Sequence, residues 1–491
     1  MLKKIRFVLA LIFWVCITLL FLDYTSGLHV YLGWMAKMQF LPAVVSLNVG
    51  VILLVLALTF LFGRVYCSVI CPMGVFQDFV NRIAGKFKKR RRSFTPEKRK
   101  LRLIILGVFV VLMFVFTPLA ILIAPYSAYG RMVSSILQPV AGAIHNMCAN
   151  IAEHYDSYAV YDVDVWLKSG STLGVAIVTF FVVTIWSWKT GRGYCNTVCP
   201  VGTVLGLIST KSLFKVRINS DKCVNCSLCE KSCKAQAIDY KKHEIDYSRC
   251  VACMNCLGVC KKDAISFVRK SPSKPAPQPS DGGVDNSLRQ TLATTALLAV
   301  AGTLKAQEKT VDGGLAVIAD KLVPEREIPV KPAGSVGLKH FSSHCTACQL
   351  CVTQCPNNVL RPSSDLKDFM QPEMSFERGY CRPECTRCSE VCPAGAILPI
   401  TKERKTSIRA GHAVWIKQNC LPVSDGVACG NCARHCPSGA ITMVPLESNP
   451  AVKIPSVDTE RCLGCGACEH LCPVRPFSAI YVEGNLVHGD M

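Results

Sequence analysis

The chain lacks the short motifs that identify most enzymes acting on soluble substrates. Its 491 residues contain no glycine-rich phosphate-binding loop, no dinucleotide fingerprint and no nucleophile–base signature. Acidic residues are scarce as well, with 34 aspartates and glutamates against 55 lysines and arginines. Much of the resulting charge of +21 lies beside apolar segments, which favours membrane orientation and anionic lipid as its explanation over nucleic acid.

Cysteine, by contrast, is abundant, with 30 residues. Disulfide frameworks are typical of short secreted chains and do not repeat one four-cysteine spacing six times. The run Cys462-Leu-Gly-Cys465-Gly-Ala-Cys468-Glu-His-Leu-Cys472-Pro473 shows this spacing most clearly. It is the ligand run of two-cluster ferredoxins, in which the fourth cysteine binds the neighbouring [4Fe–4S] cluster. We therefore predict six [4Fe–4S] clusters and a role in electron transfer, because each such cluster carries one electron.

Two of the runs predict a two-cluster ferredoxin domain at residues 216–270, with short strands at 216–218, 237–238 and 264–267. Lys234 and Lys261 stand where a proline usually follows the fourth cysteine, which adds positive charge without removing a ligand. The crossing rule assigns Cys223, Cys226, Cys229 and Cys260 to one cluster, and Cys250, Cys253, Cys256 and Cys233 to the other.

The other four runs predict a four-cluster domain at residues 306–491. Two of them begin with longer gaps, between Cys381 and Cys385 and between Cys420 and Cys429, which loop insertions can accommodate. Consecutive pairing assigns Cys345, Cys348, Cys351 and Cys392 to one cluster; Cys381, Cys385, Cys388 and Cys355 to the next; then Cys420, Cys429, Cys432 and Cys472; and Cys462, Cys465, Cys468 and Cys436. A nested pairing, with the outermost runs joined to each other, is the alternative.

Four apolar segments near the N-terminus, at about 7–22, 43–62, 101–123 and 171–188, are close to the roughly 20 residues that cross a bilayer. The segment 63–102 carries twelve lysines and arginines, whereas 23–42 and 124–170 carry one and two. This asymmetry places the N-terminus and 63–102 in the cytoplasm, and four spans return the chain there, so the ferredoxin domain at 216–270 is expected to be cytoplasmic. The fold class is therefore an α-helical membrane domain, residues 1–215, with α+β ferredoxin-like iron–sulfur domains.

Two further segments connect these domains. Residues 271–286 are rich in proline and form a linker by composition. Residues 287–305 are an alanine- and leucine-containing run that predicts a fifth transmembrane helix. A buried amphipathic segment is the alternative.

The second and fourth apolar segments are followed by similar amino-acid sequences. One reads Gly63-Arg64-Val-Tyr66-Cys67-Ser-Val-Ile-Cys71-Pro72-Met-Gly74, and the other Gly191-Arg192-Gly-Tyr194-Cys195-Asn-Thr-Val-Cys199-Pro200-Val-Gly202. Cysteines at i and i+4 lie on one helix face, so Cys67, Cys71, Cys195 and Cys199 can converge as four thiolates. Such a set suits an iron–sulfur or mononuclear metal site. The alternative is that these cysteines only pack the helix ends, as Cys16 and Cys148 are expected to do elsewhere.

A quinol that gives up electrons must also release protons, and the sequence offers acceptors on the far side of the membrane. Histidines and carboxylates suit this role because histidine titrates near neutral pH. The candidates are His29, His145, Glu153, His154, Asp156, Asp162 and Asp164. A surface histidine without this role is the alternative for each, and the sequence assigns no catalytic residue.

The four segments, the Cys-x3-Cys-Pro motifs and the ferredoxin that follows them make residues 1–270 resemble the NapH family of quinol-dehydrogenase membrane subunits, which is related to the membrane part of the regulator NosR. Residues 287–491 resemble the NapG/MauM polyferredoxins, which carry four [4Fe–4S] clusters on the periplasmic side. That second family usually begins with a twin-arginine export signal, whereas Ser287-Leu-Arg289-Gln has one arginine.

The resemblance implies oxidation of menaquinol or ubiquinol in the bacterial inner membrane and delivery of electrons to a periplasmic reductase of the nitrate reductase type, or to a small redox carrier. The expected partners are thus membrane lipid, the quinone pool and that acceptor, with no nucleic acid. Two other functions fit the same residues: a maturation factor that supplies electrons to a partner metalloenzyme, and a conduit that carries electrons outward from a cytoplasmic donor.

Overall fold

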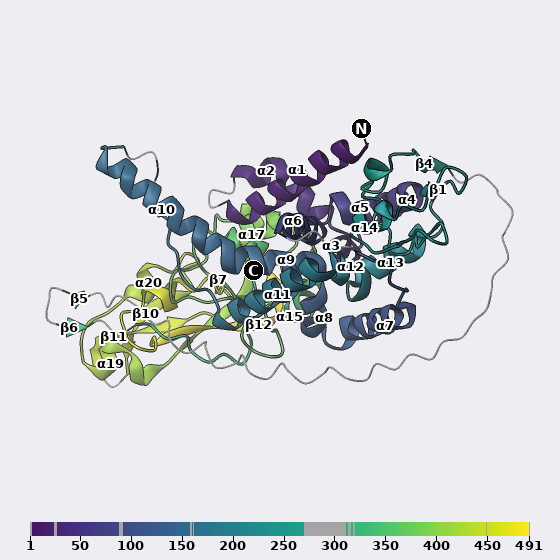
Figure 1. Cartoon of the computed structure of the whole chain (residues 1–491). Coiled ribbons are helices and arrows are strands. Elements are labelled where there is room, and N and C mark those ends of the chain that lie inside the picture. Colours follow the sequence, from purple (N-terminus) through teal and green to yellow (C-terminus); the bar gives the residue numbers. More distant parts are fainter. Residues whose placement is uncertain are drawn as a thin grey trace, which may run out of the picture.

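The computed structural model describes residues 2–23, 27–87, 92–157, 160, 162–269, 311–312, 316–317, 320–447 and 449–490. The predicted linker 271–286 and the predicted fifth helix 287–305 lie outside these residues. Four helices run between two cysteine-rich units (Figure 1): α1 (Leu2–Leu22), α4 (Val49–Phe62), α7 (Arg99–Val115) and α11 (Gly170–Thr190). We call residues 214–269 the small unit and residues 320–490 the large unit.

Helices α1 and α11 each have the small unit at one end and the large unit at the other. At the start of α1, Lys3 lies against Gly258 of the small unit. At its other end, Gln354 of the large unit donates to the carbonyl oxygens of Leu20, in the last turn, and of Asp23, just after the helix, at 2.9 and 2.8 Å. Helix α11 runs in the opposite direction. Near its start, the Ser171 hydroxyl contacts the Ser364 hydroxyl of the large unit, and just after its end the Arg192 backbone N–H donates to the Lys234 carbonyl oxygen of the small unit.

Helices α4 and α7 span the same interval. Ser46, just before α4, packs on Gly395 of the large unit, and Phe62 at its end stacks on Phe214 of the small unit. Glu97, before α7, accepts from Ser248 of the small unit, and Ile121, after α7, packs on Ala347 of the large unit. The two units therefore lie at opposite ends of a four-helix body.

Only α1 and α11, at 21 residues each, are long and apolar enough to cross a membrane among the residues that the structure describes. The predicted segment 43–62 is broken at 46–48 into α3 (Phe40–Val45) and the 14-residue α4. The predicted segment 101–123 is broken at Phe116 into the 17-residue α7, α8 (Thr117–Ala120) and a 3₁₀ turn, Ile121–Ile123. Pro118 explains the second break, since proline does not continue a helix.

The remaining helices of this body are short or lie at its ends. The predicted loop 124–170 is largely helical and includes a π-helical turn. These elements are α2 (Gly27–Lys37), α5 (Val65–Val69), α6 (Pro72–Phe87), α9 (Pro125–Met132), the π-helix η2 (Val133–Leu137), α10 (Gln138–His154), α12 (Gly193–Thr197) and α13 (Pro200–Ser209).

The small unit contains the three predicted strands. In it β1 (Phe214–Ile218) pairs antiparallel with β4 (Ile265–Arg269), and β2 (Ile238–Asp239) pairs with β3 (Glu244–Ile245). Two short helical segments, α14 (Leu228–Ser232) and η3 (Leu257–Val259), complete it. Its core, around Ala237 and Ile238, is separate from the core that α1 to α13 share with the large unit.

The large unit is built from antiparallel strand pairs and single-turn helices. Its pairs are β7 (Leu360–Pro362) with β8 (Pro372–Met374), β9 (Ile408–Trp415) with β12 (Ile480–Asp490), and β10 (Ile441–Leu446) with β11 (Asn449–Val457). Its helices are α15 (Leu338–His344), α16 (Leu350–Thr353), α17 (Arg387–Val391), α18 (Lys402–Lys405), η4 (Lys417–Asn419), α19 (Leu421–Ser424), α20 (Asn431–Arg434) and α21 (Ala467–Leu471). A separate pair joins β5 (Val311–Asp312) and β6 (Ala316–Val317).

Candidate iron–sulfur centres

The eight cysteines of the small unit lie in two groups of four. A cavity of about 180 Å³ is bounded by Cys223, Cys226, Cys229 and Cys260. A second cavity, of about 20 Å³, is bounded by Cys233, Cys250, Cys253 and Cys256. Each group takes three cysteines from one run and the fourth from the other run, which is the arrangement that the crossing rule predicts.

The sixteen cysteines of the large unit form four such groups by electrostatic contact among their thiols. The groups are Cys345, Cys348, Cys351 and Cys392; Cys381, Cys385, Cys388 and Cys355; Cys420, Cys429, Cys432 and Cys472; and Cys462, Cys465, Cys468 and Cys436. This is the consecutive pairing, and the nested pairing is not adopted.

The backbone of the regularly spaced runs has a shape that suits an anionic cluster. In each of them, the residues just before and just after the second cysteine have left-handed backbone angles. These pairs are Asn225 and Ser227, Ala252 and Met254, Ala347 and Gln349, and Gly464 and Gly466. Successive N–H groups in such a conformation form a concave nest, a shape that recurs at iron–sulfur sites. Since six of these eight residues are not glycine, the loops hold a conformation that is costly unless something stabilises it.

Burial opposes the ionisation of several thiols in these groups. Burial raises the pKa of Cys250 and Cys348 to about 12 and that of Cys432 to about 11. The thiolate is the metal ligand, so cluster binding must displace these protons. Among the residues that the structure describes, no three His, Cys, Asp or Glu side chains converge closely enough to hold a single ion. Each group does supply the four cysteines that a [4Fe–4S] cluster takes as ligands.

The four cysteines of the two Cys-x3-Cys-Pro motifs also come together. Cys67, Cys71, Cys195 and Cys199 are all buried, and the thiol of Cys199 interacts electrostatically with the other three. The prediction that each pair shares one helix face is wrong. Helix α5 ends at Val69 and α12 at Thr197, and the second cysteine of each pair lies in the turn before a proline that starts the next helix.

Each repeat supplies an arginine to the cysteines of the other repeat. The Arg192 guanidinium donates to the Cys67 carbonyl oxygen at 2.6 Å, and the Arg64 guanidinium donates to that of Cys195 at 3.1 Å. Both arginine side chains are fully buried. Gly74 is needed for this approach, because a Cβ there would lie 2.2 Å from the Cys67 oxygen. Two buried positive charges thus lie beside four buried thiols, and they match the negative charge of a thiolate-bound cluster.

A single carboxylate anchors these cations. Asp78, on α6, pairs with Arg192 at 2.7 Å, with Lys234 at 2.5 Å and with Arg6. Burial opposes ionisation of Asp78, but Arg192 and Lys234 overcome it and hold the pKa of the carboxyl far below its usual range. Beside it, the Gln77 amide donates to the Cys195 sulfur at 3.1 Å. Asp78 therefore connects α1, α6, the second motif and the small unit.

These groups follow one another through the molecule. In the large unit, Cys388 interacts with Cys351 of the next group, and Cys381 with Cys465. Tyr194 interacts with Cys199 and with Arg131, which in turn interacts with Cys348 of the large unit. On the other side, the Arg64 guanidinium donates to the Cys67 sulfur at 3.9 Å and to the carbonyl oxygen of Ser248 in the small unit at 3.0 Å, so the buried motif cysteines stand between the two units.

The predicted proton acceptors lie at several places near the large-unit end of the helices. His29 is half-buried on α2, while His145, Glu153 and His154 lie on α10, which projects away from the helical body (Figure 1). Asp156 is exposed beyond α10. Asp162 and Asp164 are different, because they line a cavity between the helices and the large unit.

Cys16 is partly buried, and Cys148 is exposed on α10; each lies apart from the groups of cysteines described above. The sequence did not assign roles to Arg64, Arg192 or Asp78. The two arginines had a signal, since each follows a glycine at the same place in the repeated text. Asp78 had none, because its partners are distant in sequence.

Family models for iron–sulfur domains match several parts of the chain. A "4Fe-4S binding domain" model matches residues 45–91 and 172–219, which contain the two Cys-x3-Cys-Pro motifs. Two further "4Fe-4S binding domain" models match residues 215–238 and 243–266 in the small unit. A "4Fe-4S dicluster domain" model matches residues 427–475.

Curated relatives are ferredoxin-type proteins. The chain is 32% identical to the methylamine utilization ferredoxin-type protein MauM of Methylobacillus flagellatus, over 32% of this chain and 70% of the relative. It is 33% identical to the ferredoxin-type protein NapG of Escherichia coli, over 36% of this chain and 84% of the relative. It is 29% identical to NapF of the same species, over 32% of this chain and 87% of the relative. No solved structure matches the chain.

Proposed function

Because the chain belongs to the family of ferredoxin-type proteins that includes MauM and NapG, we propose that it is a membrane-bound electron carrier that oxidises quinol and supplies a periplasmic reductase. That it is a ferredoxin-type iron–sulfur protein for electron transfer follows from the family and the domain matches. The membrane, the quinol and the acceptor are the proposed parts.

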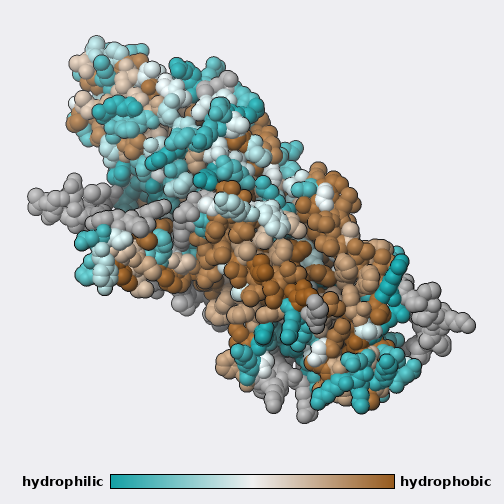
Figure 2. Space-filling model, turned by 90° about the horizontal axis from the view of Figure 1, so that it is seen from above, coloured by the Kyte–Doolittle hydropathy of each residue, from teal (hydrophilic) through white to brown (hydrophobic). Residues whose placement is uncertain are grey.

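Apolar side chains on the outside of the helical body support the membrane part. Figure 2 shows a broad apolar zone between two more hydrophilic ends. Each of the four long helices has exposed apolar side chains: Ile12 of α1 is 47% exposed, Leu53 of α4 60%, Ile104 of α7 62% and Val178 of α11 61%. Soluble monomers rarely expose a continuous apolar surface of this extent. We infer that α1, α4, α7 and α11 cross the bilayer, with the breaks in two of them covered by neighbouring helices.

The positions of the two units support transport from one side of the membrane to the other. They lie at opposite ends of α1, whose basic N-terminal end contacts the small unit. From the positive-inside rule we propose that the small unit lies in the cytoplasm and the large unit in the periplasm. We propose that the 24 cysteines in six groups hold six [4Fe–4S] clusters and that Cys67, Cys71, Cys195 and Cys199 hold a seventh.

The buried motif cysteines are the observation that carries this proposal. Their four thiols, with Arg64 and Arg192 beside them, lie between the group of Cys250 and the group of Cys348. When bound, each [4Fe–4S] cluster accepts and releases one electron. The protein supplies the low-dielectric surroundings, the compensating charges and the fixed order of sites along the helices.

The test is reduction of the purified, full-length protein in lipid nanodiscs. We expect a water-soluble quinol analogue to bleach the visible absorbance of the clusters, and the double variant Cys71→Ala/Cys199→Ala to contain about one cluster's worth less iron. Reduction only by a low-potential ferredoxin or flavodoxin would favour a conduit from a cytoplasmic donor. Loss of a partner enzyme's cofactor on gene deletion, with quinol oxidation intact, would favour a maturation factor.

A further inference from the structure

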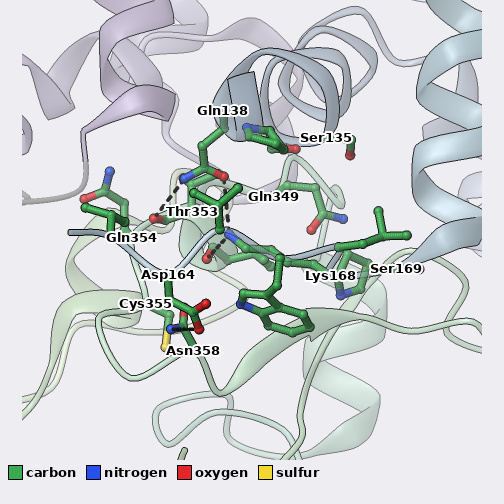
Figure 3. Close-up of a pocket in the computed structure, with 18 of the residues that line it drawn as sticks. Ser135, Gln138, Asp164, Lys168, Ser169, Gln349, Thr353, Gln354, Cys355 and Asn358 are labelled. Atoms are coloured by element: carbon green, nitrogen blue, oxygen red, sulfur yellow. Dashed lines mark hydrogen bonds between the residues drawn. The ribbon is translucent and has the colours of Figure 1, made fainter. Parts of the chain in front are cut away.

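A cavity of about 360 Å³ lies where the helices meet the large unit (Figure 3). One wall comes from the π-helix η2 and the start of α10, and a second from residues 162–172, which lead into α11. The third wall comes from α16 of the large unit and the segment that follows it. The cavity is large enough for the ring of a small organic molecule, and ligand sites commonly lie at such junctions between domains.

Four of the residues that line this space have a buried polar side-chain atom without a partner. The indole N–H of Trp166, the Thr172 hydroxyl and the side-chain oxygens of Gln349 and Gln354 are buried and have no hydrogen-bond partner among the residues of known placement. Buried polar groups are nearly always paired, so this set indicates a ligand or ordered water. It offers one N–H donor, two amide acceptors and a hydroxyl that can do either, which suits the two hydroxyl groups of a hydroquinone.

A lysine reaches across the same cavity. The Lys168 ammonium donates to the Gln138 side-chain oxygen at 3.3 Å and to the Val352 carbonyl oxygen at 3.2 Å, as Figure 3 shows. The Gln138 amide donates in turn to the Thr353 carbonyl oxygen at 3.5 Å. Lys168 thereby joins the helices to the backbone of the large unit and presents a positive charge to whatever lies beside it.

The cavity also touches a candidate cluster ligand. Cys355, at one side of the cavity in Figure 3, belongs to the group of Cys381, Cys385 and Cys388. On the rim beside it, the Asp164 carboxylate accepts from Asn358 at 3.4 Å and pairs with Arg378 at 3.5 Å. Asp162 and Asp164 are exposed, so protons that reach them pass to water.

Apolar surface adjoins the cavity on the side of the helices. Leu137 is 42% exposed, Val140 53% and Leu167 57%, and these residues lie on the elements that form the walls. A molecule with a polar ring and a long apolar tail can therefore place its ring among the polar atoms and its tail along these side chains.

We propose that this cavity binds the head group of an isoprenoid quinol and is the place where the quinol is oxidised. This inference rests on the proposed function. The hydroquinone loses its two O–H protons and two electrons and becomes the quinone. Cys355, Cys381, Cys385 and Cys388 would hold the [4Fe–4S] cluster that accepts these electrons one at a time, and the two protons would pass to Asp162 and Asp164 at the exposed rim.

The experiment is photoaffinity labelling of the full-length protein in nanodiscs with an azidoquinone, together with equilibrium binding of a tailed quinone analogue. We expect labelled peptides from 134–139 or 162–172. Replacing Lys168 with methionine should weaken binding about tenfold, because a hydrogen bond from a charged group is lost. Thr172→Val, which keeps the shape of the side chain, should weaken binding by about threefold. The matched control is Lys189→Met at the other end of α11, which should bind as the parent protein does.

Two results overturn this site. One is labelling confined to other helices, and the other is unchanged binding in both Lys168→Met and Thr172→Val. Bleaching of the clusters by quinol is measured in parallel and separates this inference from the proposed function. If quinol still bleaches the clusters while the two variants bind normally, the function stands and the site is wrong. If quinol never bleaches them, the proposed function itself fails.

Discussion

Replacing Asp78 with asparagine should destabilise the protein strongly, because three cations share this one buried carboxylate. The side chain is 11% exposed, and that of its partner Arg192 is 0% exposed. Asparagine preserves the size of the side chain and its acceptor oxygen for the Arg192 Nε, which lies 2.7 Å away, but it removes the charge. The substitution therefore tests charge and leaves packing almost unchanged.

The expected loss of stability comes mainly from the ion pair between Asp78 and Arg192. Removing one partner of a buried ion pair costs about 3–5 kcal/mol, because the remaining charge has no compensation. Lys234 and Arg6, with side chains 5% and 11% exposed, gain little relief from water. We therefore expect the free energy of unfolding to fall by about 4 kcal/mol. For a folded domain of about 150 to 250 residues, a loss of about this size lowers the apparent unfolding midpoint by roughly 10 °C. That loss is a large part of the total stability of about 5–15 kcal/mol that is typical of folded proteins.

The assay is thermal unfolding in nanodiscs at neutral pH, with Asp221→Asn as the control, since Asp221 is exposed in the small unit. The double variant Asp78→Asn/Arg192→Gln should lose less than the sum of the two single variants, because it also removes the uncompensated charge. In the parent protein the contribution of Asp78 is complete above the unfolded pKa of about 3.8 and declines only in strong acid, since the pKa of the folded state is far lower. An Asp78→Asn midpoint equal to that of the control would refute the reasoning.

Three further predictions concern the large unit. Cys465→Ala should lower the iron content by about one cluster with α1 and α11 still folded, whereas loss of about four clusters would show that the large unit folds only around its metals. The Lys405 ammonium donates to the Cys381 sulfur at 3.2 Å, so Lys405→Met should lower the reduction potential of that site by roughly 60 mV, with exposed Lys402→Met as the control and potentiometric titration as the measurement. Burial lowers the pKa of His488 to about 4, and neither ring nitrogen has a partner among the described residues, so protonation destabilises the folded state. The unfolding midpoint should therefore fall as the pH drops from 6.5 to 4, by the equivalent of about 2 kcal/mol, and His488→Phe should abolish this dependence; an unchanged pH profile in the variant would contradict it.

The iron–sulfur runs were predictable because their information is local. A Cys-x-x-Cys-x-x-Cys run fixes a loop of one shape, and the groups of Cys223 and Cys250 form as the spacing requires. The lengths of the predicted apolar helices were harder to predict. Apolar composition indicated the segments 43–62 and 101–123, but composition does not reveal the breaks at 46–48 and at Phe116. The shared helix face predicted for the motif cysteines was wrong for a reason that the sequence itself contains, because a proline follows Cys71 and Cys199 and starts the next helix.

The sequence by itself determined which side chains can bind iron and sulfur, that the chain repeats one Cys-x3-Cys-Pro motif, and which apolar segments accompany it. Spacing along the chain is enough for this, because the cysteines of each run lie within 16 positions of one another. Only the tertiary structure decided that Arg64 and Arg192 exchange between repeats and that Asp78 gathers cations from three elements. It also decided that Lys168 closes a cavity against the large unit. These contacts join residues that lie 72 to 184 positions apart in the sequence. Whether residues so far apart meet depends on how the helices pack, and no local sequence pattern reveals it.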